Sequence, residues 1–259
     1  MNKTIIFVIA NQKGGVAKTT TAVNLATGFA DLNYQTILID CDPQGNAGPF
    51  LGVPQAPGLY QLVIERKPLR DVAQPVEGYP NLALVPGNEW TAEVNATLER
   101  GKLFKPETAL RDALAPLRGN GRPKSLVIIL DTGPSLNALQ ISALNAADWL
   151  IIPATPEFAS EMGLAALSTT LDEMHQAGSH LNLLGVLPTM VDSRAKEHEF
   201  ILEKFQATFP GFVLPPIHKL IALAEAPARK APIWSYAPTS KAANEYGLVL
   251  KEVIKRAKL

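Results

Sequence analysis

The sequence predicts an α/β protein with a doubly wound, mostly parallel sheet flanked by helices. Short, continuous apolar runs recur along the chain, and runs without polar alternation are typical of strands covered on both faces, as in parallel sheets. Segments with helical periodicity separate these runs, and alternating strands and helices favour an open α/β sheet. A length of 259 residues fits one such domain, so we expect residues 1–259 to fold as a single unit.

The expected elements follow one another in a regular order. Strands are predicted at residues 4–10, 36–40, 82–85, 125–130, 149–152 and 183–187. Helices are predicted at residues 18–32, 136–147, 161–176, 197–209 and 241–258. Residues 48–124 are richer in proline and glycine, and we expect a helical and irregular elaboration of the same domain there.

The composition excludes several classes of protein. Apolar residues make up 47% of the chain and charged residues 19%, unlike an intrinsically disordered protein. Cys41 is the single cysteine, which excludes a disulfide scaffold and a cysteine-rich zinc module. No apolar run approaches 18 residues, and the first one meets glycine and lysine too early for a signal peptide. We expect a soluble, cytoplasmic protein without stable membrane insertion.

Charge is distributed unevenly along the chain. The net charge is zero, yet residues 219–259 contain eight basic and three acidic residues, a balance of +5. Such asymmetry points to an anionic partner at one face of the protein.

The strongest local signal is the glycine-containing segment that follows the first predicted strand. Residues 13–20 read K-G-G-V-A-K-T-T and lead into the first predicted helix. Glycines let such a loop curl around a phosphate, and the helix N-terminus adds backbone N–H groups and a positive dipole. Lys18 can reach the β- and γ-phosphates, and the hydroxyl of Thr19 can bind Mg²⁺.

This loop resembles the deviant Walker A loop of the ParA/MinD family of ATPases. The standard pattern G-x-x-x-x-G-K-S/T fails at both glycines, where Gln12 and Ala17 stand, whereas K-G-G-x-x-K-S/T fits. Residues 38–46 (LIDCDPQGN) and 128–135 (IILDTGPS) resemble two further family segments. Matches at residues 152–164, 188–194 and 224–227 extend the resemblance over nearly the whole chain. The D-P-Q-G-N and E-A-P segments favour the ParA (Soj-like) branch.

The resemblance implies a P-loop fold, the cofactors ATP and Mg²⁺, and a role for each matching residue. Thr19 and Asp131 would hold the metal, Asp131 through a water. Asp42 would orient the attacking water, although Asp40 is the next candidate for that role and could instead be a capping or salt-bridge acid. The implied nucleotide contacts are Lys13, Gly14, Gly15, Val16, Ala17, Lys18, Thr19, Thr20 and Met190, and the implied catalytic residues are Lys13, Lys18 and Asp42.

In the family, the extra lysine, here Lys13, reaches across a two-fold interface to the nucleotide of the partner subunit. The resemblance therefore implies a homodimer that forms around ATP, with slow hydrolysis that a partner stimulates. It also implies non-specific DNA binding in the ATP state, a ParB-like or other adaptor, and a nucleoid-associated location in the cytoplasm. The cargo would be a plasmid, a chromosome or a protein assembly such as a carboxysome.

Several positions depart from the family pattern. Thr132 and Gly133 replace the usual Cys-Pro after the second acid, which should change the stiffness of the turn more than the chemistry. Residues 215–218 (PPIH) displace the usual Ile-Pro order near the adenine. Ala222 replaces an arginine that is a candidate DNA contact in the family. We expect DNA binding to depend instead on Lys219, Arg229, Lys230, Lys251 and Lys255.

Two other classes of function compete with this one. A MinD-like membrane-associated regulator would need a free amphipathic C-terminal segment. Apolar residues recur at helical spacing from Ala243 to Ala257, and we expect that stripe to dock on the core. A kinase or amidoligase that shares the loop would need a pocket for an acceptor substrate, and no segment indicates one.

Overall fold

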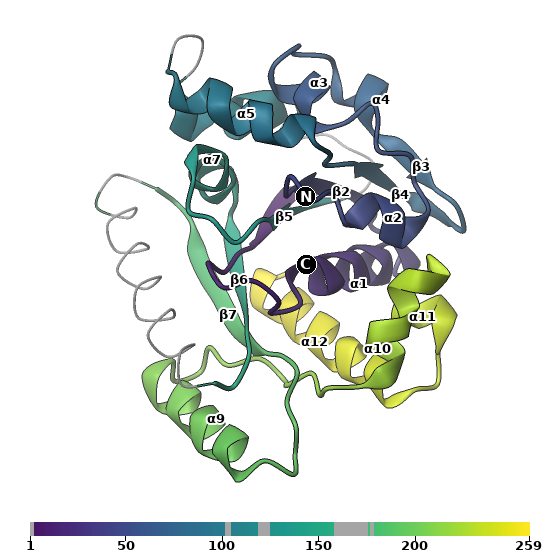
Figure 1. Cartoon of the computed structure of the whole chain (residues 1–259), viewed down its shortest axis with the longest axis vertical. Helices are drawn as coiled ribbons and strands as arrows, with labels where there is room; N and C mark the ends of the chain where they lie inside the picture. The colour runs from purple at the N-terminus through teal and green to yellow at the C-terminus, as the bar shows by residue number, and fades with distance from the viewer. Residues whose placement is uncertain (1–2, 102–104, 119–124, 158–175, 177–178) are drawn as a thin grey trace.

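The computed structural model describes residues 3–101, 105–118, 125–157, 176 and 179–259, and these form a seven-stranded sheet between two layers of helices (Figure 1). The strand order is β3-β4-β2-β5-β1-β6-β7. All neighbouring strands are parallel except β3 and β4. The strands are β1 (Thr4–Ile9), β2 (Gln35–Cys41), β3 (Gln74–Val76), β4 (Tyr79–Val85), β5 (Leu126–Thr132), β6 (Trp149–Ala154) and β7 (Asn182–Pro188).

The sheet separates two apolar cores. Phe7 and Ile9 of β1 face one core, which is covered by α1, α2, α11 and α12, while Ile6 and Val8 face the other, which is covered by α3–α7 and α9. In Figure 1, α1 and α10–α12 gather on one side of the sheet and α3, α5 and α7 on the other. The helices are α1 (Lys18–Asp31), α2 (Ala47–Leu51), α3 (Leu59–Val63), α4 (Leu69–Val72), α5 (Trp90–Glu99), α6 (Ala109–Leu114), α7 (Ala138–Ala146), α9 (Lys196–Thr208), α10 (Ile221–Glu225), α11 (Ile233–Tyr236) and α12 (Lys241–Ala257).

The predicted fold class is confirmed, with one strand missed. All six predicted strands are present within a few residues of their expected bounds. The missed strand, β3, is a three-residue edge strand that contains Pro75 and pairs antiparallel with β4, and so short a run carries no periodicity. The described part of residues 48–124 contains α3–α6 together with β3 and β4. The helix predicted at 161–176 falls almost wholly outside the described residues.

The apolar stripe of the C-terminal segment docks on the core, as its spacing predicted. Tyr246, Val249 and Val253 of α12 are fully buried. The Tyr246 hydroxyl lies 3.3 Å from Thr21 Oγ1 of α1, and the Ser240 side chain caps the helix by accepting from the backbone N–H of Ala243. Within the described part of the chain, no helix is long and apolar enough to cross a bilayer.

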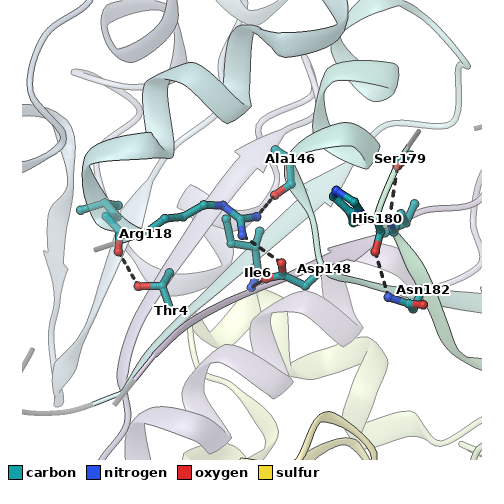
Figure 2. A network of polar contacts seen from close by, with 10 residues as sticks. Thr4, Ile6, Arg118, Ala146, Asp148, Ser179, His180 and Asn182 are labelled. Atoms are coloured by element: carbon teal, nitrogen blue, oxygen red, sulfur yellow. Dashed lines mark hydrogen bonds and ion pairs between the residues drawn. The ribbon is translucent and has the colours of Figure 1, made fainter. Parts of the chain in front are cut away.

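Asp148, directly before β6, is hydrogen-bonded to β1 and ion-paired with Arg118 (Figure 2). Asp148 Oδ2 accepts a hydrogen bond of 2.7 Å from the backbone N–H of Ile6, and Asp148 Oδ1 lies 2.9 Å from Arg118 Nη1. Arg118 also donates to the carbonyl of Ala146. These bonds connect the start of β6 to the middle of β1, and Arg118 to the end of α7.

Candidate functional site

Three adjacent strands bring the predicted site residues to one edge of the sheet. Asp40 near the end of β2 lies opposite Asp131 of β5, and Asp131 lies opposite Ile9, the last residue of β1. The loop of residues 13–17 follows β1 and leads into α1. In open α/β sheets, ligands bind beyond the carboxyl ends of the strands. The sheet therefore brings together the loop and both acids, as the sequence predicted.

The loop leaves open space beside its glycine backbone at the N-terminus of α1. Gly15 has φ +73°, and a Cβ added at Gly14 or Gly15 would meet no atom within 4 Å. Ala17 adopts the left-handed conformation with φ 62°, where a Cβ is unfavourable. No side chain caps the first turn of α1, and that turn contains no acidic residue. Its N–H groups and dipole are thus available to an anion.

Lys18 places a buried cation at the centre of this loop. Its side chain is 7% exposed, and Nζ donates a hydrogen bond of 2.9 Å to the carbonyl of Lys13. Burial lowers the pKa of Lys18, and the carboxylates of Asp131 and Asp42 oppose that shift. The ammonium group is therefore held close to both acids.

Asp40 is a structural acid. Its Oδ1 accepts from the backbone N–H of Asp42 and its Oδ2 from that of Ala47, each at 3.0 Å. Burial raises the pKa of Asp40 to about 7, against the lowering effect of these two bonds. Because Ala47 is the first residue of α2, Asp40 caps that helix and shapes the loop that carries Asp42. This outcome matches the capping alternative that the sequence left open.

Asp131 is a buried acid whose oxygens form no hydrogen bond of normal geometry with the described residues. The residue is fully buried, and neither carboxylate oxygen has a partner at normal geometry among the described residues. Burial and the Asp40 carboxylate raise the pKa of Asp131 well above its usual range, while Thr19 and Lys18 oppose the rise. Two orphaned oxygens beside a hydroxyl are suited to a hard cation such as Mg²⁺ and its waters. The donors present thus fit the metal that the family implies.

Asp42 is the accessible acid of the three. It is half-buried, and its Oδ1 accepts from the backbone N–H of Gln44 at 2.9 Å. Its carboxyl group lies against Gly133, where an added Cβ would be 3.4 Å from Asp42 Cγ. On the other side, an added Cβ at Gly87 would lie 2.6 Å from the Asp42 carbonyl. Close backbone packing on two sides holds this residue at the mouth of the site.

Lys13 pairs with groups of its own chain at the end of β6. Its Nζ lies 2.6 Å from Glu157 Oε2 and 3.2 Å from Thr155 Oγ1. The Lys13 side chain is 33% exposed and that of Glu157 is 56% exposed. The sequence interpretation missed Thr155 and Glu157, although polar residues directly after an apolar strand at the same sheet edge are a usable signal.

Met190 lies beside the loop on the β7 side. It follows β7, is 40% exposed and has φ 54°. The preceding Thr189 donates a hydrogen bond of 3.2 Å to the carbonyl of Val16 in the loop. The backbone of Ile217 bonds to Pro188 and to Val191. The displaced segment 215–218 therefore runs next to Met190.

The five candidate DNA contacts are all exposed, on neighbouring elements at the C-terminal part of the chain. Lys219 precedes α10, Arg229 and Lys230 end the short helix η3 (Ala226–Arg229), and Lys251 and Lys255 lie on α12. Lys255 lies 3.6 Å from Glu252, which partly neutralises it. Lys219, Lys230 and Lys251 form no ion pair with any residue that the structure describes. The positive charge predicted for this region is thus mostly available to a partner.

The arrangement of the sheet and the loop is typical of one class of protein. A phosphate loop between a buried parallel strand and a helix, with acids at the ends of the next two strands on one side of it, is the arrangement of P-loop nucleoside triphosphatases.

Comparisons with known proteins identify the family within this class. A family profile described as an AAA domain matches residues 3–183. The chain is 39% identical to the chromosome-partitioning ATPase Soj of Thermus thermophilus, covering 96% of this chain and 94% of that protein. It is 36% identical to the chromosome partitioning protein ParA of Myxococcus xanthus, covering 97% and 88%. The chain therefore belongs to the ParA/Soj family of partition ATPases.

Solved structures share the fold of this chain. The McdA–ATP complex from Cyanothece superposes with a TM-score of 0.86 at 21% identity, covering 100% of this chain and 98% of that one, and shows the shared fold. Cobyrinic acid a,c-diamide synthase from Mycobacterium smegmatis, with an ATP analogue and magnesium, has a TM-score of 0.82 at 29% identity and covers 98% and 96%.

Removal of the unpaired carboxylate of Asp131 should stabilise the folded protein. Because the pKa of Asp131 is raised in the folded state from its ordinary value of 3.8, the folded protein retains a proton that the unfolded chain loses, and stability falls as pH rises above about 4. In EDTA, Asp131→Asn should stabilise the protein by on the order of 1–3 kcal/mol at pH 8 and by little at pH 4.

Urea unfolding at both pH values measures this gain. The exposed Asp71→Asn serves as the control and should show no such growth with pH. An Asp131→Asn variant with the pH dependence of the parent would show that the buried carboxylate is not destabilising.

Proposed function

We propose that the chain is a Mg²⁺-dependent ATPase that dimerises around ATP, binds non-specific DNA in that state and positions a cargo. The observation that carries the proposal is the open loop beside two buried charges, Lys18 and the orphaned Asp131. A buried carboxylate without a partner is costly, and a metal-bound triphosphate would supply the missing cation to Asp131 and the missing anion to Lys18.

Each residue of the site has a distinct part in this proposal. The backbone of residues 13–17 and the first turn of α1 hold the phosphates, Lys18 neutralises charge at the β- and γ-positions, and Met190 borders the base. Thr19 and Asp131 hold Mg²⁺, which supplies charge neutralisation on the phosphates when bound. Asp42 orients the attacking water from the mouth of the site. These roles follow the geometry and the resemblance together.

Lys13 has a different task, which is to contact the nucleotide of a second subunit. Its charge is paired with Glu157 in the single chain, and this partly exposed pair is weak enough to exchange. A phosphate of the partner subunit would replace Glu157 as the counter-ion. Nucleotide binding and dimerisation would then be linked, since the dimer contact exists only when the nucleotide is present.

Lys13→Ala should separate ATP binding from dimerisation. Calorimetry should show an affinity for Mg²⁺ and a non-hydrolysable ATP analogue within about threefold of the parent, while light scattering should show a monomer. Lys3→Ala, a change of another lysine near the N-terminus, is the control and should leave the dimer intact. A Lys13→Ala protein that dimerises as tightly as the parent would refute the role in the partner's site.

The DNA-binding part of the proposal rests on charge. A basic region that mostly lacks acidic partners is suited to a polyanion, and a dimer doubles the number of phosphate contacts. The relatives named as chromosome-partitioning proteins favour a chromosome or plasmid as cargo, with an adaptor that stimulates slow hydrolysis and with the nucleoid as the site of action. Because the stripe of α12 is buried against the core, it is not available to a membrane.

Reversal of three charges should abolish this DNA affinity. Each lysine or arginine that neutralises a phosphate contributes about 0.9 to the slope of log affinity against log salt. With ATP analogue, Lys219→Glu/Arg229→Glu/Lys230→Glu should weaken binding to any duplex at least tenfold and flatten that slope, as measured by fluorescence anisotropy.

The control for this variant reverses the same number of charges on the opposite face. Lys67→Glu/Arg70→Glu/Arg111→Glu lies on α4, α6 and the loop before α4, and should bind like the parent. Equal losses of DNA affinity in both variants would show that the effect comes from net charge alone. DNA binding by the first variant at the affinity of the parent would contradict nucleoid association. Liposome binding in its place would favour the MinD-like alternative.

A further inference from the structure

We propose that Gln140 of α7 is a positioning residue for ATP hydrolysis, because its side-chain amide fixes the turn on which the Asp42 carboxylate rests. The inference deepens the proposed function, in which Asp42 orients the attacking water. Gln140 itself would touch neither nucleotide nor water. It would act through the peptide of Gly133.

The Gln140 amide joins the end of β5 to the end of β1. Its Nε2 donates to Thr132 Oγ1 and to the carbonyl of Gly133, each at 3.2 Å. The Thr132 hydroxyl in turn donates to the carbonyl of Ile9 at 2.9 Å. Since Ile9 is the last residue of β1, before the phosphate loop, one side chain on α7 connects both strand ends that frame the site.

Gly133 transmits this anchoring to Asp42. An added Cβ at Gly133 would lie 3.4 Å from Asp42 Cγ and 3.5 Å from both carboxylate oxygens, so the Gly133 backbone borders the Asp42 carboxylate with space for about one Cβ between them. A glycine has no side chain to restrict its own backbone. The position of this turn must therefore be held from outside, and the bond from Gln140 to the Gly133 carbonyl does so.

The cost of burying Gln140 supports a role beyond packing. The residue is 4% exposed, and its Oε1 is buried with no hydrogen-bond partner among the described residues. An unsatisfied buried acceptor lowers the stability of the folded state. Most other buried positions of α7 are apolar, such as Leu139 and Leu144. A leucine at position 140 would avoid this cost but could not hold the turn.

The local sequence gives a reason why this chain needs such a contact. Thr132 and Gly133 stand where the family pattern has Cys-Pro. A proline ring would restrict the turn covalently. Without it, the hydroxyl of Thr132 and the amide of Gln140 restrict the same turn through hydrogen bonds.

The test compares Gln140→Leu with the parent in single-turnover ATP hydrolysis and in calorimetric binding of an ATP analogue. Misplacement of a positioned group lowers turnover with little effect on affinity. We expect the single-turnover rate constant to fall about tenfold, an affinity within twofold of the parent, and unfolding at an equal or higher temperature. Unchanged turnover, or parallel losses of affinity and turnover, would overturn the proposal.

Ser142→Ala provides a matched control on the same helix. Ser142 is buried, and its Oγ accepts from the backbone N–H of Leu110 at 2.9 Å, away from the site. This variant should lose stability and retain the turnover of the parent. If Ser142→Ala slows hydrolysis as much as Gln140→Leu, both effects come from general loosening of α7 and the positioning role is wrong.

The Gly133→Pro variant tests whether Gln140 acts on Asp42 through Gly133. Thr132 ends strand β5, and the residue before a proline must be extended, so Gly133→Pro is compatible with the turn. In that background, Gln140→Leu should reduce the single-turnover rate constant less than twofold, because the ring replaces the hydrogen bond. An undiminished loss would overturn the path through Gly133.

Asp42→Ala is measured in parallel and separates the two proposals. Slow hydrolysis by Asp42→Ala with normal hydrolysis by Gln140→Leu would overturn the inference alone. Normal hydrolysis by both variants would overturn the role of Asp42 as well.

Discussion

The burial of charge at the ends of β1, β2 and β5 is the constraint on which the rest of the structure depends. The parallel register sets Asp40 beside Asp131, and the loop after β1 brings Lys18 to the same edge, where it is 7% exposed. Buried charges cost several kcal/mol each unless they are paired. Asp40 is satisfied by two backbone N–H groups, whereas Asp131 is not. The fold thus leaves the buried charge of Asp131 unpaired among the described residues, and a bound metal–phosphate ligand would neutralise it.

A bound ligand could replace the present contacts of the two lysines at the site. Lys18 bonds to the carbonyl of Lys13, and Lys13 bonds to Glu157. A triphosphate would compete for both lysines. A ligand shifts a conformational balance only by the difference in its affinity for the two states. Exchange of these lysine contacts is a local source of that difference, and it links the phosphate loop to the end of β6 and hence to a second subunit.

The sequence predicts the fold and the core of the site well because both depend on local patterns. Six strands and the phosphate loop are marked by apolar runs and by glycines. The contact between Lys13 and Glu157 is different, since it joins residues that lie far apart in the chain, and only the sheet order brings them together. The contacts of Gln140 are local and cross the turn between β5 and α7, where no periodicity marks them. The structural role of Asp40 could not be separated from a catalytic one, because both roles need an acid at a strand end. The short β3 carried too few residues for any periodicity.

If the site takes up metal and nucleotide together, thermal unfolding should reveal the dependence of one ligand on the other. A ligand that binds only the folded state stabilises it by about 2.7 kcal/mol at a hundred times its dissociation constant. With a non-hydrolysable ATP analogue and Mg²⁺ both present, the parent protein should unfold several degrees higher, while the analogue in EDTA or Mg²⁺ alone should have little effect. An equal shift with the analogue in EDTA, or no shift with both ligands, would contradict the account.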